Sequence, residues 1–200
     1  MTQTRIIPAK SPEAIPAALE VIAAGGTVVF PTDTVYGLAA SAFSAQAIEK
    51  LFEIKVRERG KPIPVLLGDV DQLQDVVKDP SPAAIALAEK HWPGALTLVV
   101  PRHPQMPETL SPLPTLGVRI PDHPVALALL KAAGPLAVTS ANLSGAENTT
   151  TAQEARSQLD GRVDLILDGG QTPGGVPSTV VDMTGETPRV LRQGPIEIES

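Results

Sequence analysis

A run of polar side chains near the start of the chain has the residue types of a ligand site. It begins directly after Thr27–Phe30, a short β-branched apolar run that predicts a buried strand. Pro31 has no N–H for a strand ladder, so we expect the strand to stop there. The polar residues that follow are Thr32, Asp33, Thr34 and Tyr36. Ligands of α/β proteins bind outside the carboxyl ends of strands, which makes this cluster a candidate site, although an ordinary Asp/Thr turn has the same composition.

Further polar groups border short apolar runs later in the chain. The run Leu136–Thr139 leads into Ser140–Gly145, which is rich in hydroxyl and amide groups. A glycine-rich segment that contains Ser178 leads into another apolar run, and Arg192 leaves a third. Any one of these segments alone is compatible with an ordinary turn. Together they predict several strand ends with small polar groups, as a small polar ligand requires.

One arginine is expected inside a strand. Arg119 lies in the apolar run Gly117–Pro121, and no acidic residue follows it before Asp122. A charge in such surroundings is seldom left unpaired. We therefore expect Arg119 to be poorly compensated until the carboxylate of a ligand reaches it.

The densest cationic segment spans residues 50–61. It holds Lys50, Lys55, Arg57, Arg59 and Lys61 against two glutamates, and a solvated helix face is the alternative explanation. The chain has neither a P-loop nor a G-x-G-x-x-G motif after its first strand. If a nucleotide binds, side chains such as these must neutralise its phosphates. No Ser-His-Asp or Cys-His pattern occurs, so the expected chemistry is positioning and charge neutralisation without a covalent enzyme intermediate.

The composition predicts one soluble domain that spans residues 1–200. Hydrophobic residues make up 42% and charged residues 19%, and the net charge of −6 argues against a protein that coats nucleic acid by charge alone. The absence of cysteine excludes disulfides and thiolate chemistry, and three separated histidines make a structural metal site improbable. No apolar run approaches the ~20 residues that span a bilayer, and the first residues do not resemble a signal peptide. We expect a cytoplasmic protein without a membrane partner.

Helices and strands alternate along the chain, which predicts an α/β fold. The expected helices start at Ser11-Pro12, Ser44, Asp69, Ser81-Pro82, Pro124 and Thr151, and end near Gly25, Val56, Val77, Lys90, Gly134 and Leu159. The expected strands are residues 27–30, 65–67, 96–100, 118–120, 136–139, 163–167, 179–181 and 190–191.

These segments, taken in order, resemble the YrdC-like family. The motifs are Pro31–Leu38, Lys55-x-Arg57 with Lys61-Pro62, Trp92–Thr97, Val118–Pro121, Ser140–Gly145, Pro177–Val180 and Leu191-Arg192-x-Gly194. The resemblance covers the chain from about Arg5 to Ile196. It implies a single-domain, twisted mixed sheet with flanking helices and an open, concave, basic site at the strand ends.

Members of this family are threonylcarbamoyl-AMP synthases, and the resemblance implies their reaction. They convert L-threonine, bicarbonate and ATP into threonylcarbamoyl-AMP and pyrophosphate, and the product feeds threonylcarbamoyladenosine formation beside the anticodon of tRNA. Mg²⁺ is implied as a companion of ATP, not as a metal held by the protein. Implied partners are the downstream threonylcarbamoyl-transferase machinery and a weak contact with tRNA.

The family motifs also imply roles for individual residues. Threonine contacts would come from Thr34, Arg119, Ser140 and Ser178, with Arg119 on the carboxylate. ATP contacts would come from Lys55, Arg57, Lys61, Thr115, Asn142, Thr150 and Arg192, with Lys55 and Arg57 neutralising charge during catalysis. Some members hold threonine with a histidine in the strand after the Lys-Pro step, and Leu66 occupies that position here.

Two other functions are compatible with the same features. One is an RNA-binding or ribosome-maturation module, which the cationic segment favours and the acidic total and scarce aromatics disfavour. The other is the carbamoyl-transfer chemistry of hydrogenase maturation, where a YrdC-like unit is part of a much longer protein.

Overall fold

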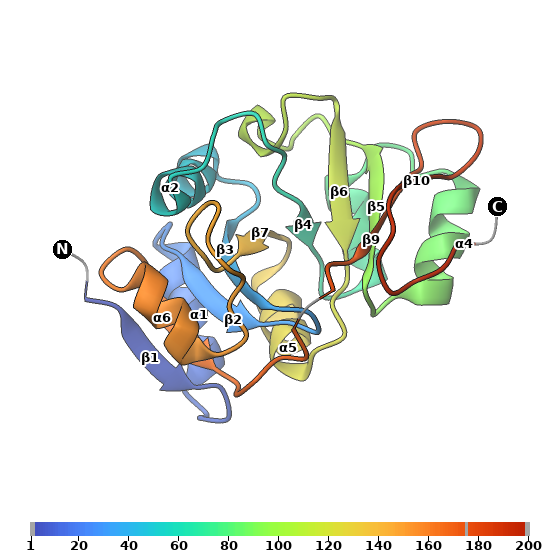
Figure 1. The fold of residues 1–200 in the computed structure, drawn as a ribbon. Helices are drawn as coiled ribbons and strands as arrows, with labels where there is room; N and C mark the ends of the chain where they lie inside the picture. The colour runs from blue at the N-terminus through green and yellow to red at the C-terminus, as the bar shows by residue number, and fades with distance from the viewer. Residues whose placement is uncertain (1–2, 175, 199–200) are drawn as a thin grey trace.

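Ten strands form one mixed sheet, and helices pack on both of its faces, in the computed structural model of residues 3–174 and 176–198 (Figure 1). The strands follow the order β1-β8-β2-β3-β7-β4-β6-β5-β9-β10, with parallel and antiparallel neighbours. Their bounds are β1 Arg5–Pro8, β2 Val28–Pro31, β3 Tyr36–Ser41, β4 Val65–Leu66, β5 Leu96–Pro101, β6 Thr115–Arg119, β7 Leu136–Ser140, β8 Leu165–Asp168, β9 Thr179–Asp182 and β10 Arg189–Arg192. The predicted α/β fold with a mixed sheet and flanking helices is confirmed.

Most of the helices begin where the sequence offers a capping side chain; α1 and α3 do not. Their bounds are α1 Ala14–Ala23, α2 Ala45–Lys55, α3 Leu73–Val76, α4 Pro82–His91, α5 Pro124–Ala133 and α6 Ala152–Leu159, with 3₁₀ turns η1 Val70–Gln72 and η2 Glu108–Leu110. The hydroxyls of Ser44, Ser81 and Thr151 accept N–H bonds at the first turns of α2, α4 and α6. Thr151 and Glu154 form the predicted capping box.

The predicted start of the first helix is wrong by several residues. Helix α1 begins at Ala14, and its N-cap residue Glu13 makes no side-chain bond to the helix. Ser11 instead takes part in the tight connection from β1, because its N–H donates to Pro8 O and its carbonyl accepts from Ala14 N. A Ser-Pro pair opens turns as readily as helices, and here the turn out of β1 uses it.

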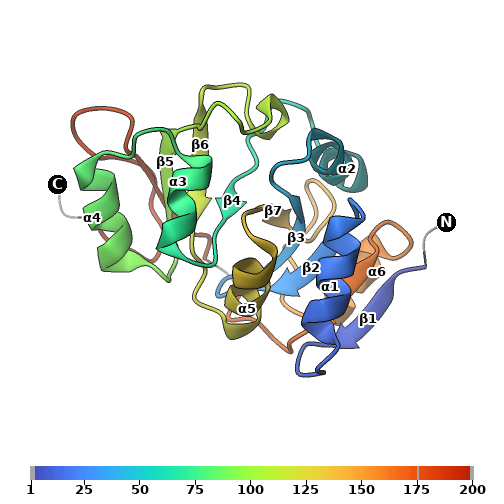
Figure 2. The ribbon, with the colours of Figure 1, turned by 180° about the vertical axis from the view of Figure 1, so that it is seen from behind.

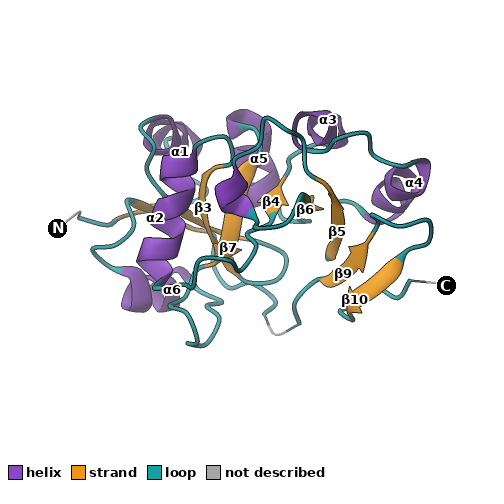
Figure 3. Cartoon of the chain, turned by 90° about the horizontal axis from the view of Figure 1, so that it is seen from above, coloured by secondary structure: helices purple, strands orange, loops and turns teal. Residues whose placement is uncertain are grey.

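The core lies on both faces of the sheet. Helices α1 and α5 pack side by side on one face, over alternate residues such as Phe30, Ala39 and Leu136 (Figure 2). Helices α2, α3, α4 and α6 cover the other face, over residues such as Leu38 and Val118. Strand side chains alternate between faces, so the register fixes which residues share one. Figure 3 shows β9 and β10 at the end of the sheet away from α1 and α6.

A hairpin that the sequence analysis missed shapes the first polar cluster. Strand β3 pairs antiparallel with β2 on one side and β7 on the other, and Pro31 still pairs with Tyr36. Strand β2 thus ends at Pro31, as expected, although Pro31 itself still pairs with Tyr36. Residues 32–35 form the turn of this hairpin. Strand β3 contains Gly37 and alanines, which have weak strand propensity, and pairing on both sides overrides that preference.

Candidate functional site

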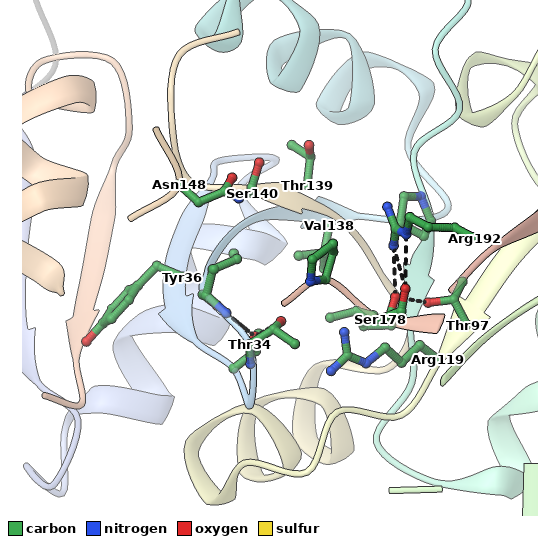
Figure 4. Close-up of a pocket in the computed structure, with 16 residues that line it drawn as sticks. Thr34, Tyr36, Thr97, Arg119, Val138, Thr139, Ser140, Asn148, Ser178 and Arg192 are labelled. Atoms are coloured by element: carbon green, nitrogen blue, oxygen red, sulfur yellow. Dashed lines mark hydrogen bonds between the residues drawn. The ribbon is translucent and has the colours of Figure 1, made fainter. Parts of the chain in front are cut away.

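A pocket of about 360 Å³ opens where the β2–β3 turn faces β4, β6 and β7. The residues that line it come from segments distant in sequence (Figure 4). They are Thr32, Thr34, Val35, Tyr36, Gly37, Pro64, Leu66, Thr97, Arg119, Val138, Thr139, Ser140, Asn148, Pro177, Ser178 and Arg192. Polar hydroxyl and guanidinium groups therefore surround an apolar wall that includes Leu66 and Val138.

The two threonine hydroxyls of the hairpin turn are linked to each other. Thr32 Oγ1 and Thr34 Oγ1 lie 3.0 Å apart, and Thr32 Oγ1 also donates to Val35 O at 2.7 Å. The same Thr32 oxygen accepts from the backbone N–H groups of Thr34 and Val35. The turn thus fixes the Thr34 hydroxyl, and Thr34 lines the pocket.

Arg119 is paired inside the protein, so the expectation that it lacks a partner is wrong. Its Nη2 donates to Asp33 Oδ1 at 2.5 Å, and its Nε donates to Gly94 O at 2.9 Å. The sequence analysis missed the pair because Asp33 is 86 positions away along the chain. The β2–β3 turn brings this carboxylate to the end of β6, and the Arg119 side chain still lines the pocket.

Ser178 and Arg192 form a connected group at the same end of the pocket. Ser178 Oγ lies 2.8 Å from Thr97 Oγ1. Arg192 donates to Ser178 O from Nε at 3.0 Å and from Nη2 at 2.8 Å, and Nη2 also reaches Ser178 Oγ at 3.2 Å (Figure 4). Burial, and then the charge of Arg119, lowers the pKa of the Arg192 guanidinium.

At the other end, Ser140 lies over a buried lysine. Lys55 is the last residue of α2 and is 2% exposed. Its Nζ donates to the carbonyls of Ser140 and Asn142 at 2.5 Å each and to Asn142 Oδ1 at 3.2 Å, and lies 3.4 Å from Ser140 Oγ. Burial, and then the charge of Arg57, lowers the pKa of Lys55 to about 8. Lys55 is thus not a member of a solvated helix face.

The remaining predicted ATP contacts lie outside the lining of this pocket. Arg57 Nη2 donates to Pro62 O at 3.2 Å, and Lys61 pairs with Glu58 at 3.2 Å. Thr115 pairs with Pro101 at the start of β6. The Thr150 hydroxyl donates to Glu154 at 3.0 Å. The structure therefore brings five of the predicted site residues together in the pocket lining: Thr34, Arg119, Ser140, Ser178 and Arg192. Lys55 and Asn142 lie behind Ser140. The other four predicted residues, Arg57, Lys61, Thr115 and Thr150, lie outside the lining.

Several site residues were not assigned from the sequence. Thr97, Thr139 and Asn148 line the pocket. Thr97 stands inside the quoted Trp92–Thr97 motif, whereas Asn148 lies in a loop that offers no comparable signal. Tyr36, in contrast, is fully buried and its ring points away from the pocket in Figure 4. Its hydroxyl donates to Gly170 O at 2.6 Å, and burial raises its pKa.

Among the described residues, no group of three or more His, Cys, Asp or Glu side chains is placed to hold a metal ion. The helices of this part of the chain are too short or too polar to cross a membrane.

Comparisons with known proteins agree with this geometry. A family model named for Sua5, YciO and YrdC, with the description "Telomere recombination", matches residues 20–194. A Mycobacterium tuberculosis protein named "Putative threonylcarbamoyl-AMP synthase" is 43% identical, over 96% of this chain and 89% of its own length. The Bacillus subtilis threonylcarbamoyl-AMP synthase is also 43% identical, but this chain spans only 51% of it.

Two solved structures follow the same fold. Pyrococcus abyssi Sua5 complexed with L-threonine has a TM-score of 0.89 and 36% identity, over 97% of this chain and 57% of that one. Escherichia coli YciO has a TM-score of 0.86 and 32% identity, over 98% of both chains. The family model reaches from within α1 to just past β10, and it includes every polar group of the pocket. This chain therefore belongs to the Sua5, YciO and YrdC family.

Proposed function

We propose that this protein is a threonylcarbamoyl-AMP synthase. It condenses L-threonine, bicarbonate and ATP into threonylcarbamoyl-AMP and pyrophosphate, for the modification of tRNA beside the anticodon. One observation carries the proposal: Thr34, Arg119, Ser140 and Ser178 converge on one pocket from distant segments of the chain. The matching fold of P. abyssi Sua5, which was solved with L-threonine, supports an amino acid as the ligand.

The pocket suits a small amino acid. Arg119 offers a cation for the carboxylate, while hydroxyls at both ends offer hydrogen bonds. Leu66 and Val138 give an apolar surface for the threonine methyl group. Some family members contact threonine with a histidine at the position of Leu66, and this part of the pocket is apolar here.

The reaction needs two charged substrates held together. Threonine and bicarbonate first give N-carboxythreonine and water. An oxygen of its N-carboxylate group then attacks the α-phosphorus of ATP, the bond from this phosphorus to the oxygen that bridges to the β-phosphorus breaks, and pyrophosphate leaves. Lys55 and Arg192 supply positive charge beside Ser140 and Ser178, and Mg²⁺ comes bound to the triphosphate. Arg57, whose charge acts on Lys55, stays a predicted charge-neutralising contact. Lys61, Thr115, Asn142 and Thr150 stay predicted ATP contacts. Proximity and charge neutralisation supply the acceleration, because the mechanism needs no covalent enzyme intermediate.

The RNA-binding alternative gains no support from the cationic segment. Lys55 is buried, Lys50 donates to Gly25 O at 2.6 Å, and Arg59 pairs with Glu49 at 3.0 Å. Most of these cations contact the protein itself. The transferase partners, the weak tRNA contact and the cytoplasmic location stay part of the proposal.

The test is incubation of the purified protein with ATP, L-threonine and bicarbonate. We expect pyrophosphate and a product with the mass of threonylcarbamoyl-AMP, and neither when threonine or bicarbonate is omitted. Ser178→Ala should weaken threonine use, whereas Ser157→Ala, on the exposed side of α6, should not. ATP consumption at the same rate without threonine would show a different activity.

A further inference from the structure

Asp33 lies beside the pocket but not in its lining. Its neighbours Thr32 and Thr34 line the cavity, whereas the Asp33 carboxylate meets Arg119 behind it. Both side chains are largely shielded from water, with 9% of Arg119 and 14% of Asp33 exposed. At such burial, an ion pair with a hydrogen bond holds its geometry much more firmly than a surface pair does.

The guanidinium of Arg119 is held at two of its three nitrogens. Nη2 donates to Asp33 and Nε donates to Gly94 O, so the orientation of the planar group is fixed. Nη1 has no hydrogen-bond acceptor among residues 3–174 and 176–198. The side chain extends along the pocket toward Thr34 in Figure 4. Two of the three nitrogens are therefore bonded to the protein, and Nη1 is not.

The charges at this end of the pocket also favour an anionic ligand. Burial, and then the nearby charge of Arg119, lowers the pKa of Arg192, so the two guanidinium groups lie close to each other. Asp33 offsets one of these two positive charges. One net positive charge therefore remains on this pair of arginines for anionic ligands.

We propose that Asp33 is a positioning residue for substrate recognition: it orients Arg119 so that Nη1 meets the α-carboxylate of threonine. This inference rests on the proposed function. Asp33 touches neither substrate, so its influence must pass through Arg119. Its loss should raise the KM for threonine, with little change in the KM for ATP or in kcat at saturating threonine.

Asp33→Asn and Asp33→Ala test the proposal together. Asparagine keeps an oxygen that accepts from Nη2 but loses the charge, so we expect the threonine KM to rise about 3–10-fold. Alanine removes the contact, and a rise of roughly 30-fold or more is expected. Asp182→Ala is the matched control, because Asp182 is 17% exposed and pairs with Arg189 at 3.0 Å. It should leave the threonine KM unchanged.

The same substitution in an Arg119→Ala background separates positioning from general support of the fold. If Asp33 acts through Arg119, adding Asp33→Asn to Arg119→Ala should change the threonine KM no further. Equal increases in both KM values for Asp33→Asn would overturn the proposal. A lower threonine KM would also overturn it, since Asp33 would then compete with the substrate carboxylate. Wild-type enzyme that forms no threonylcarbamoyl-AMP would refute the proposed function itself, before any variant is compared.

Discussion

At the scale of single residues, Lys55 has unusual surroundings for an ammonium group. Its hydrogen-bond acceptors in the described structure are carbonyl, amide and hydroxyl oxygens, and none is a carboxylate. Burial is the main cause of its lowered pKa of about 8, and the nearby charge of Arg57 adds to it. Charge at this position therefore costs folding free energy, and anionic phosphates beside Ser140 would recover part of that cost.

This pKa predicts how the stability depends on pH. The folded pKa lies below the value of 10.5 expected for an unfolded lysine, so between about pH 8 and 10.5 the unfolded chain binds more protons. The stability that depends on Lys55 should rise with pH across this window, by up to about 3 kcal/mol. Urea denaturation gives the free energy of unfolding of wild type and of Lys55→Met at pH 7 and at pH 9.5. The difference between the two proteins should change between these two pH values. Lys50→Met is the control, because Lys50 lies in the same helix but is only half-buried. A constant difference would mean that Lys55 titrates as an ordinary lysine.

The sequence was sufficient to identify pocket residues but not their partners. Thr34, Arg119, Ser140, Ser178 and Arg192 were found because each belongs to a short local motif. The contacts Asp33–Arg119 and Lys55–Ser140 join residues 86 and 85 positions apart, and no local pattern encodes such contacts. For this reason Arg119 was expected to lack a partner, and a solvated helix face stayed an alternative explanation for Lys55.

At the scale of elements, helix α2 ends in a strained conformation. Val56, its C-cap residue, has φ 51° and ψ 44°, in the left-handed region that β-branched residues disfavour. Its side chain is 73% exposed, so packing does not compensate for the strain. The left-handed conformation of Val56 turns the chain sharply after Lys55, whose side chain is buried, and before Arg57.

Val56→Gly should stabilise the protein by about 1 kcal/mol, because glycine adopts this conformation without strain. Val190→Gly is the contrasting control. Val190 is also exposed, at 42%, but it lies in strand β10, where glycine should destabilise the fold. Chemical denaturation gives the change in the free energy of unfolding of each variant relative to wild type. Loss of stability in Val56→Gly would show that contacts of the valine outweigh its strain.

Element prediction succeeded where a capping signal stands beside a periodic apolar pattern, as in α2, α4 and α6. It failed for β3, whose glycine and alanines carry no strand signal, and for β1, which lies at the edge of the sheet. Both strands have a partner that is distant in sequence. Strand β1 pairs with β8, and β3 pairs with β7.

At the scale of the whole molecule, the last described segment of the chain supports the pocket from behind. A Cβ atom on Gly194 would lie 2.4 Å from Thr179 N and 2.5 Å from Pro177 O, on either side of Ser178. Thr179 Oγ1 also accepts from Gly194 N at 3.0 Å. Glycine at this position lets two backbone segments touch, and the wall that carries Ser178 depends on that contact.

Gly194→Ala should therefore destabilise the protein by about 1–3 kcal/mol and raise the threonine KM, since relieving the clash moves Ser178. Gly185→Ala is the matched control, because its Cβ would meet a single atom, at 3.9 Å. Thermal unfolding and threonine titration of both variants give the comparison. An unchanged KM in a destabilised Gly194→Ala protein would show that this contact supports the fold without positioning Ser178.

The strand order has a consequence for synthesis and folding. Strands β8 and β9 are consecutive in the chain but are separated in the sheet by β2, β3, β7, β4, β6 and β5. Contacts such as Thr4–Val163 and Tyr36–Gly170 close loops of 159 and 134 residues. Such a high contact order slows folding, because loop-closure entropy is lost before the contacts form. During translation, the Thr34 end of the pocket must wait for Ser178 and Arg192 to leave the ribosome, so the pocket forms only after both residues have been synthesised.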